Sequence, residues 1–214
     1  MTPLCEIANR TGADKGPFHH NYTPIYHKYF QHLRDQPLNL LELGFGGYQY
    51  PDRGGHGAMM WAEYFLEGTI ITTDVHIKQP LGHNRIFFQQ CSQDDKERFA
   101  ELFSNYGVPQ IIVDDASHLS SLTVKSFEIL FPALSSGGIY VVEDVHTSYW
   151  TEHGFDGTPD IFNLHHKSTM NYFKLLSDSL NIEHSSAASA WQPGFTDEIE
   201  SIHFYKQMIF IFKK

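Results

Sequence analysis

The sequence predicts an α/β protein in which helices cover both faces of a mostly parallel β-sheet. Short apolar runs alternate with segments of helical periodicity, and an unbroken apolar run is typical of a strand buried on both faces. The expected strands are residues 38–44, 69–74, 85–90, 110–115 and 139–144. Residues 201–214 contain one or two further strands but no room for the crossover helix that parallel pairing needs. We therefore expect an antiparallel strand at one edge of the sheet.

Helices are expected between the strands, where apolar residues recur three or four positions apart. The expected helices are residues 22–34, 58–65, 94–107, 120–134 and 160–180. Glycine at the end of the third segment supplies a stop signal. A chain of 214 residues suits one domain. We expect residues 1–214 to form that domain, with residues 1–37 as a helical cap region.

The composition indicates a globular protein, because 41% of the residues are hydrophobic and 14% are aromatic. A net charge of -10, from 15 basic and 25 acidic residues, disfavours nucleic acid as a partner. No window reaches the roughly 18 apolar residues that a membrane span needs. Cys5 and Cys91 lack metal-type spacing, and the first residues do not resemble a signal peptide. These features predict a cytoplasmic protein that uses no membrane.

A glycine-rich turn follows the first expected strand, in the stretch LLELGFGGYQY of residues 40–50. Gly44 and Gly46 allow the backbone to approach a ligand closely. The second strand ends in Asp74, whose carboxylate can accept both hydroxyls of a ribose. Ligands of such sheets bind beyond the carboxyl ends of the strands. The alternative is that the glycines only form a turn.

The residues around this turn favour S-adenosylmethionine over a nicotinamide dinucleotide. A dinucleotide site needs a helix that starts at once to meet the pyrophosphate, and Pro51 with further glycines intervenes here. Glu42, two residues before the first glycine, is unfavourable near phosphate. It suits a cofactor that carries a sulfonium and an ammonium group.

Acidic doublets end the fourth and fifth expected strands, as Asp114-Asp115 and Glu143-Asp144. If these strands are neighbours, their ends lie about 5 Å apart. Carboxylates at that spacing repel unless one is protonated or a cation bridges them. Strand alternation makes Asp115 and Asp144 the expected pair on the ligand side. Their hard oxygens suit Mg²⁺, with Ca²⁺ or Mn²⁺ as alternatives.

His118 follows Asp115 by three residues, where a loop or first helical turn brings it over the same site. A histidine is the natural general base for a hydroxyl near neutral pH. A neighbouring metal would lower the pKa of that hydroxyl. His146 is close enough in sequence to the second doublet to compete as ligand or base.

Structural explanations of the same residues remain open at this point. Asp114 or Ser117 could cap the helix that follows them. Asp144 could be a solvated turn residue, and His118 could be structural.

Together these motifs resemble class I S-adenosylmethionine-dependent methyltransferases, and more narrowly the metal-dependent sugar O-methyltransferases of macrolide and related antibiotic pathways. The similarity spans nearly the whole chain, in order. The matching stretches are TGADKG (11–16), YTPIYHKYF (22–30), LLELGFGGYQYPDRGGHGAMMWAEYF (40–65), CSQDD (91–95), VDDASH (113–118), GGIYVVEDVHTSYW (137–150) and IHFYKQMIFIFKK (202–214).

The resemblance implies a Rossmann-like fold with a seven-stranded sheet, and roles for particular residues. The cofactor-binding residues would be Glu42, Gly44 and Gly46 at the methionine part, Asp74 at the ribose, Ser92 and Gln93 near the adenine, and Asp114. The metal would be Mg²⁺, bound by Asp115 and Asp144 with help from Glu143. His118 would be the catalytic base, with Asp115 as the second catalytic residue.

The acceptor implied by the resemblance is a vicinal diol on a sugar, and the chain is expected to form a homo-oligomer. Acceptor contacts are expected on loops 48–57, 145–160 and 187–198. Their aromatic residues include Tyr48, Tyr50, His56, Tyr149, Trp150 and Trp191. Three alternatives remain open: a non-sugar hydroxylated acceptor, a nicotinamide-dependent oxidoreductase, and a non-catalytic cofactor-binding subunit.

Overall fold

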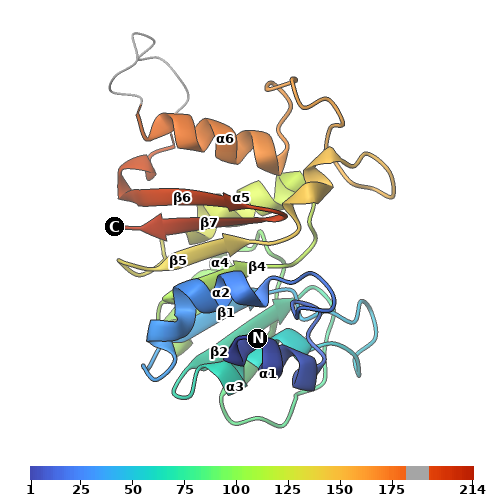
Figure 1. The fold of residues 1–214 in the computed structure, drawn as a ribbon, viewed down its shortest axis with the longest axis vertical. Coiled ribbons are helices and arrows are strands. Elements are labelled where there is room, and N and C mark those ends of the chain that lie inside the picture. Colours follow the sequence, from blue (N-terminus) through green and yellow to red (C-terminus); the bar gives the residue numbers. More distant parts are fainter. Residues whose placement is uncertain (182–192) are drawn as a thin grey trace.

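The computed structural model describes residues 1–181 and 193–214, and within them one twisted sheet lies between two layers of helices (Figure 1). The strand order is β3-β2-β1-β4-β5-β7-β6, and the described sheet has seven strands. The strands are β1 Asn39–Leu43, β2 Thr69–Asp74, β3 Ile86–Gln90, β4 Ile111–Asp114, β5 Ile139–Val142, β6 Ile199–Tyr205 and β7 Met208–Lys213.

The strand directions confirm the predicted mixed sheet. Strands β1 to β5 pair in parallel, whereas β7 pairs antiparallel with both β5 and β6. Only Lys206 and Gln207 separate β6 from β7, and Gln207 takes a φ of 66°. Because so short a connection can only form a hairpin, the tail adds an antiparallel pair at the edge.

Helices cover the two faces of the sheet in two groups. The helices are α1 Pro3–Thr11, α2 Thr23–Phe30, α3 His56–Tyr64, α4 Lys96–Tyr106, α5 Ser120–Leu130 and α6 Thr169–Ser179. Side chains of α1, α2 and α3 share one hydrophobic cluster with alternate strand residues such as Leu40 and Val113. Side chains of α4, α5 and α6 share the other with Leu41 and Ile112. Neighbouring strand residues therefore face opposite cores, which explains the unbroken apolar runs.

The structure differs from the predicted helices in two places. The helix expected at 160–180 begins only at Thr169, because Ser168 caps it by accepting a hydrogen bond from the Asn171 amide at 3.3 Å. Helix α1 was not predicted, although Thr2, Pro3 and Gly12 mark its start and end. The expected cap region 1–37 contains α1, α2 and the short 3-10 helix η1 Gln31–Leu33.

The lengths of the helices also bear on the membrane prediction. No helix in the described ranges is long and apolar enough to cross a bilayer.

Candidate active site

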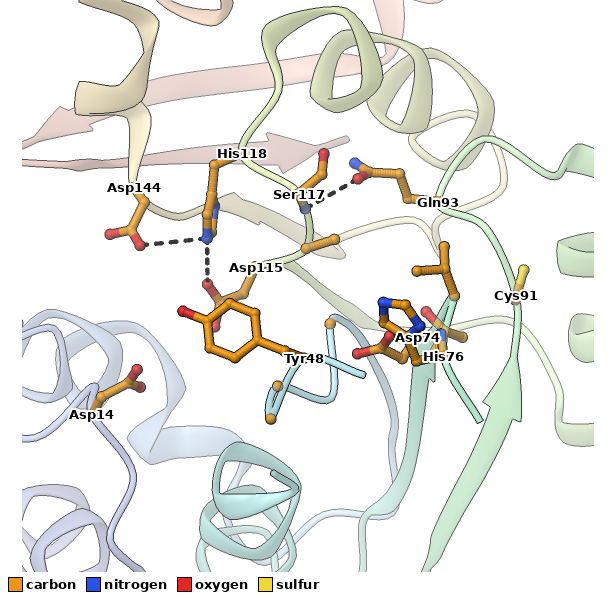
Figure 2. Close-up of a pocket in the computed structure, with 16 residues that line it drawn as sticks. Asp14, Tyr48, Asp74, His76, Cys91, Gln93, Asp115, Ser117, His118 and Asp144 are labelled. Atoms are coloured by element: carbon orange, nitrogen blue, oxygen red, sulfur yellow. Dashed lines mark hydrogen bonds and ion pairs between the residues drawn. The ribbon is translucent and has the colours of Figure 1, made fainter. Parts of the chain in front are cut away.

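A cavity of about 420 Å³ opens at the carboxyl ends of β1, β2, β4 and β5 (Figure 2). This is the edge at which sheets of this kind bind ligands. Among the predicted site residues, those that line it are Gly44, Gly46, Asp74, Gln93, Asp115, His118 and Asp144. A smaller cavity of about 180 Å³ shares Gly44, Gly46 and Asp115 with it and is also lined by Glu42.

The glycine turn after β1 packs directly on the end of β4. Gly44 has a φ of 94°, and a Cβ there would lie 2.1 Å from the backbone oxygen of Asp115. No other residue type fits that contact. Helix α3 starts only at His56, with Gly55 at its N-cap and no side-chain cap. The prompt phosphate-binding helix of a dinucleotide site is therefore missing from this turn, as the sequence predicts.

Asp74 ends β2 at the mouth of the larger cavity. Its Oδ2 accepts a hydrogen bond from the Phe45 amide at 3.3 Å, and its Oδ1 accepts one from the His76 amide at 2.9 Å. These bonds fix a carboxylate beside the glycine turn, where a ribose would need it.

Of the two residues predicted to lie near the adenine, one lines the cavity and one does not. Gln93 lines the cavity, and its Oε1 accepts a hydrogen bond from the Ser117 amide at 3.1 Å. Cys91 lines it as well. Ser92 does not line either cavity described above; its hydroxyl donates to Asp94 Oδ1 at 2.6 Å.

Glu42 is a buried acid in the wall of the smaller cavity. The Trp61 indole N–H donates to its Oε1 at 2.9 Å. Burial raises the pKa of Glu42 to about 7, and the Lys15 ammonium 3.8 Å away opposes that shift. A positively charged ligand in this cavity would favour the ionised form.

Three predicted residues converge in a possible metal cluster: Asp115, His118 and Asp144 each offer one ligand atom, and these atoms lie within 4.8 Å of one another. His118 Nε2 lies 3.6 Å from Asp144 Oδ2 and 3.8 Å from Asp115 Oδ1 (Figure 2). None of the three side chains is fully buried, so solvent or a ligand can reach the cluster.

Backbone geometry, and not strand alternation alone, brings Asp144 into this cluster. In the sheet Asp114 pairs with Val142, so that Asp115 is level with Glu143. Asp144 then adopts a φ of 51°, and His118 one of 55°. Left-handed conformations are uncommon outside glycine, although Asn, Asp and His adopt them more readily than other residues, and they cluster at functional sites.

The inner members of the two doublets turn away from the cluster. Asp114 is buried on the α5 side, where Ser126 and Tyr140 donate to its Oδ2 at 2.8 and 3.2 Å. Burial raises the pKa of Asp114 to about 6. Glu143 is buried on the α2 side, bound by the Tyr26 hydroxyl and by Lys15. Neither residue lines the larger cavity, so the predicted ligand roles of Asp114 and Glu143 stay predictions.

The helix that follows His118 is capped from elsewhere in the chain. Asp156 accepts hydrogen bonds from the amides of Ser120 and Ser121 at 2.6 and 2.9 Å. Asp114 does not cap this helix, and the Ser117 hydroxyl accepts only from the Leu119 amide, at 3.2 Å. The capping explanation is therefore wrong for Asp114, because its carboxylate lies in the core.

His146 lies at the edge of the cluster and not within it. Its Nδ1 is 4.0 Å from Asp144 Oδ1, and its ring packs edge-on against Trp150. Burial lowers the pKa of His146, which favours the neutral ring.

The aromatic residues predicted to contact the acceptor are only partly described. Tyr48 lines the larger cavity and is 81% exposed; Tyr149 and Trp150 are also exposed. His56 lines the smaller cavity and bonds the backbone oxygen of Thr11. Trp191 lies outside the described residues.

Lys15 is a site residue that the sequence reasoning missed. Its side chain is 2% exposed, and its ammonium contacts Asp115 and Glu143. The sequence signal for Lys15 is its position in the matching stretch TGADKG. No local pattern predicts that a lysine so far along the chain from both acids contacts them.

The donor set fits a hard divalent cation. Two carboxylates and an imidazole converge beside a cavity that has room for water and for a ligand. Mg²⁺ prefers one or two carboxylates and retains waters, and Mn²⁺ accepts the same oxygen ligands. Asp115 and Asp144 would hold such an ion.

Relatives of this chain are O-methyltransferases. It is 36% identical over 206 residues to the 8-demethyl-8-(2-methoxy-alpha-L-rhamnosyl)-tetracenomycin-C 3'-O-methyltransferase of Streptomyces olivaceus, a match covering 96% of this chain and 52% of that protein. It is 34% identical over 211 residues to the demethylmacrocin O-methyltransferase of Streptomyces fradiae, covering 98% of this chain and 53% of that protein. No protein-family model matches the chain.

Solved structures of a methyltransferase are also similar to this chain. The MycE methyltransferase from the mycinamycin biosynthetic pathway, in complex with Mg and SAH, superposes with a TM-score of 0.90 at 33% identity, over 99% of this chain and 53% of that one. The complex of MycE with Mg, SAH and mycinamycin VI gives a TM-score of 0.87 at 32% identity, over 99% of this chain and 54% of that one.

The sheet order and the superposition on MycE define the fold as that of a class I S-adenosylmethionine-dependent methyltransferase. Within that class, the chain is similar over nearly its whole length to sugar O-methyltransferases of macrolide and tetracenomycin biosynthesis, of which MycE is one. The resemblance predicted from the motifs is confirmed. The chain spans about half the length of the curated relatives it matches.

Proposed function

We propose that this chain is an S-adenosylmethionine- and Mg²⁺-dependent O-methyltransferase that acts on a sugar hydroxyl of a glycosylated natural product. The observation that carries the proposal is the cluster of Asp115, His118 and Asp144 at the wall of the cavity that the glycine turn and Asp74 also line. The relatives named above support the reaction class and the type of acceptor.

The cofactor would lie along the carboxyl ends of β1 and β2. Gly44 and Gly46 leave room for its methionine part, and Glu42 faces the smaller cavity with a carboxylate that can balance a cationic ligand. Asp74 would accept the ribose hydroxyls, and Gln93 would lie at the adenine. When bound, the cofactor supplies the methyl group.

Asp115 and Asp144 would hold the metal ion, which would fix the acceptor hydroxyl and lower its pKa. Each acid is itself held in place: Lys15 binds Asp115, and the Tyr22 hydroxyl donates to Asp144. These contacts limit the directions in which the free oxygens point. Positioning of this kind, together with charge stabilisation, would supply most of the catalysis.

His118 would accept the proton of the acceptor hydroxyl at Nε2, the ring atom that faces both acids. The Thr147 hydroxyl lies 3.0 Å from the His118 backbone oxygen and 2.9 Å from that of Asp144. It therefore links the two backbone segments that carry the base and the acid.

Cytoplasmic location, a homo-oligomeric state and the lack of a nucleic-acid partner stay predictions. Cys5 and Cys91 are both free and buried, which agrees with a reducing compartment. The net charge of -10 continues to argue against a nucleic-acid partner.

The proposal is tested by incubating the purified chain with S-adenosylmethionine, Mg²⁺ and a panel of glycosylated macrolides that carry vicinal diols. We expect one added methyl group by mass spectrometry, and no product when EDTA replaces Mg²⁺. Matched acceptors that lack one hydroxyl of the diol are the control and should not react. Methylation that EDTA leaves unchanged, or oxidation of the acceptors with NAD, would contradict the proposal.

A further inference from the structure

Lys15 provides a buried cation where three neighbouring strands end. Its Nζ contacts Asp115 Oδ2 and lies 3.0 Å from Glu143 Oε2 and 3.8 Å from Glu42 Oε1. These acids follow or end β4, β5 and β1, which are adjacent in the sheet. One ammonium therefore links an acid of the cofactor side to two acids of the metal side.

The two carboxylate oxygens of Asp115 have different partners. Lys15 binds Oδ2, while Oδ1 faces His118 Nε2 at 3.8 Å. Because the carboxylate is rigid and planar, fixing Oδ2 also sets the direction of Oδ1. Glu143 is held still more completely, since Lys15 binds Oε2 and the Tyr26 hydroxyl donates to Oε1.

The backbone around Lys15 is itself anchored. Its carbonyl oxygen accepts hydrogen bonds from the amides of Tyr22 and Thr23, at 2.9 and 3.1 Å, where helix α2 begins. The hydroxyl of Tyr22 goes on to Asp144. A short N-terminal segment thus supplies donors to the acids that follow both β4 and β5.

Burial of an ammonium is costly unless opposite charges surround it. Packing alone would be served better by an apolar side chain at this depth. The presence of a lysine among buried and partly buried acids therefore points to a requirement of the site for its charge.

We propose that Lys15 is a positioning residue: its ammonium orients Asp115 and holds Glu143 beside it, so that the Asp115–His118–Asp144 cluster is preformed for a divalent cation. The inference rests on the proposed function, in which Asp115 and Asp144 hold the metal. Groups that bind to metal-ligating carboxylates from outside typically contribute about 10- to 100-fold to metal affinity.

The test measures Mn²⁺ binding by calorimetry in wild type and in Lys15→Met, which keeps most of the side-chain volume but removes the charge. We expect Mn²⁺ affinity to fall by about 10- to 100-fold in the variant. Lys213→Met is the matched control, because Lys213 is another largely buried lysine, paired with Glu198 at 2.8 Å on the C-terminal strand. It should bind Mn²⁺ as wild type does.

A second variant separates charge from packing. Lys15→Ala removes the atoms of n-propylammonium, and adding that ion should restore Mn²⁺ affinity, whereas 1-propanol, a neutral molecule of similar shape, should not. Equal rescue by both compounds would assign Lys15 to packing and overturn the proposal. Failure of both variants to fold, with no recovery by the amine, would overturn it as well.

The outcomes also separate this proposal from the proposed function. If wild type binds neither Mn²⁺ nor S-adenosylmethionine, the proposed function fails. If wild type binds both and Lys15→Met binds Mn²⁺ with unchanged affinity, only the positioning role of Lys15 is wrong.

Discussion

The two acidic doublets at the ends of β4 and β5 have the same plan but different surroundings. In each, the outer acid, Asp115 or Asp144, faces the cavity, and the inner acid, Asp114 or Glu143, is buried. Asp114 is bound by two neutral hydroxyls on the α5 side. Glu143 is bound by a hydroxyl and by the Lys15 ammonium on the α2 side.

This difference indicates that a pair of strand-end acids need not act together. An acid that neutral hydroxyls satisfy inside the core stabilises the strand end and its helix. An acid that shares a cation with its neighbours belongs to the electrostatics of the site. The role of each acid can therefore be tested by substituting it alone.

Removal of the outer acids should have the largest effect. Asp115→Ala and Asp144→Ala each delete a carboxylate of the cluster, and loss of metal assistance costs several kcal/mol, or about 1000-fold in turnover. Methyl transfer to a glycosylated acceptor, measured with and without Mg²⁺, checks this. A variant that keeps its Mg²⁺-dependent turnover would remove that acid from the metal site.

His118→Ala should have the next largest effect, because this side chain faces the outer acid of each doublet. Loss of a general base typically lowers the rate about 100- to 10,000-fold, while S-adenosylmethionine affinity should stay unchanged, since the side chain lies at the acid cluster. Rates and calorimetry on the same protein give both values. His146→Ala is the matched comparison and should keep a normal rate. If His118→Ala is normal and His146→Ala is slow, His146 and not His118 is the base.

Removal of the inner acid of the first doublet should affect stability more than function. Asp114→Ala leaves the Tyr140 hydroxyl without its buried acceptor, which costs about 1–3 kcal/mol, whereas the Ser126 hydroxyl can still donate to the Leu122 backbone oxygen at 2.8 Å. Urea denaturation measures that loss in the free energy of unfolding. If the variant instead loses S-adenosylmethionine affinity at full stability, the cofactor role predicted for Asp114 from the sequence is correct.

The last prediction concerns Glu42, the acid that shares Lys15 with Asp115 and Glu143. Burial raises its pKa from 4.5 to about 7, so the folded chain binds this proton more readily than the unfolded chain does. Its ionisation therefore opposes folding, and stability should fall as the pH rises from about 4.5 to about 7. The free energy of unfolding, measured by urea denaturation across this pH range, should fall less steeply with pH in Glu42→Gln than in wild type.

The exposed acid Glu97 supplies the control for that pH experiment. Glu97→Gln also removes one carboxylate, but from the surface of α4. Its free energy of unfolding should fall with pH as steeply as that of wild type. An equal flattening by both variants would mean that the slope does not come from Glu42.

Much of the fold could be predicted from the sequence, because it depends on local periodicity and on chain length between strands. Strands β1 to β5 read as apolar runs, and the hairpin of β6 and β7 follows from its two-residue connection. The late start of α6 could not be predicted, since apolar residues at 161–164 imitate a helical pattern. Those side chains are exposed loop residues.

The site could be predicted where it lies at strand ends, as with Gly44, Asp74 and Asp115. Contacts from distant segments could not be predicted: Lys15 is 100 residues from Asp115, and Asp156 caps a helix 36 residues away. Nor does strand alternation explain Asp144, whose left-handed backbone decides where it points. These features depend on tertiary packing, which a local pattern does not record.

The central claim is that one cavity binds both S-adenosylmethionine and a divalent cation. The most direct measurement is calorimetric titration of S-adenosylmethionine into the purified chain, in Mg²⁺ and in EDTA, with NAD as the comparison ligand and a separate Mg²⁺ titration. The account predicts saturable binding of S-adenosylmethionine, none of NAD, and a Mg²⁺ signal that Asp115→Ala abolishes. Binding of NAD instead, or of neither cofactor, would contradict it.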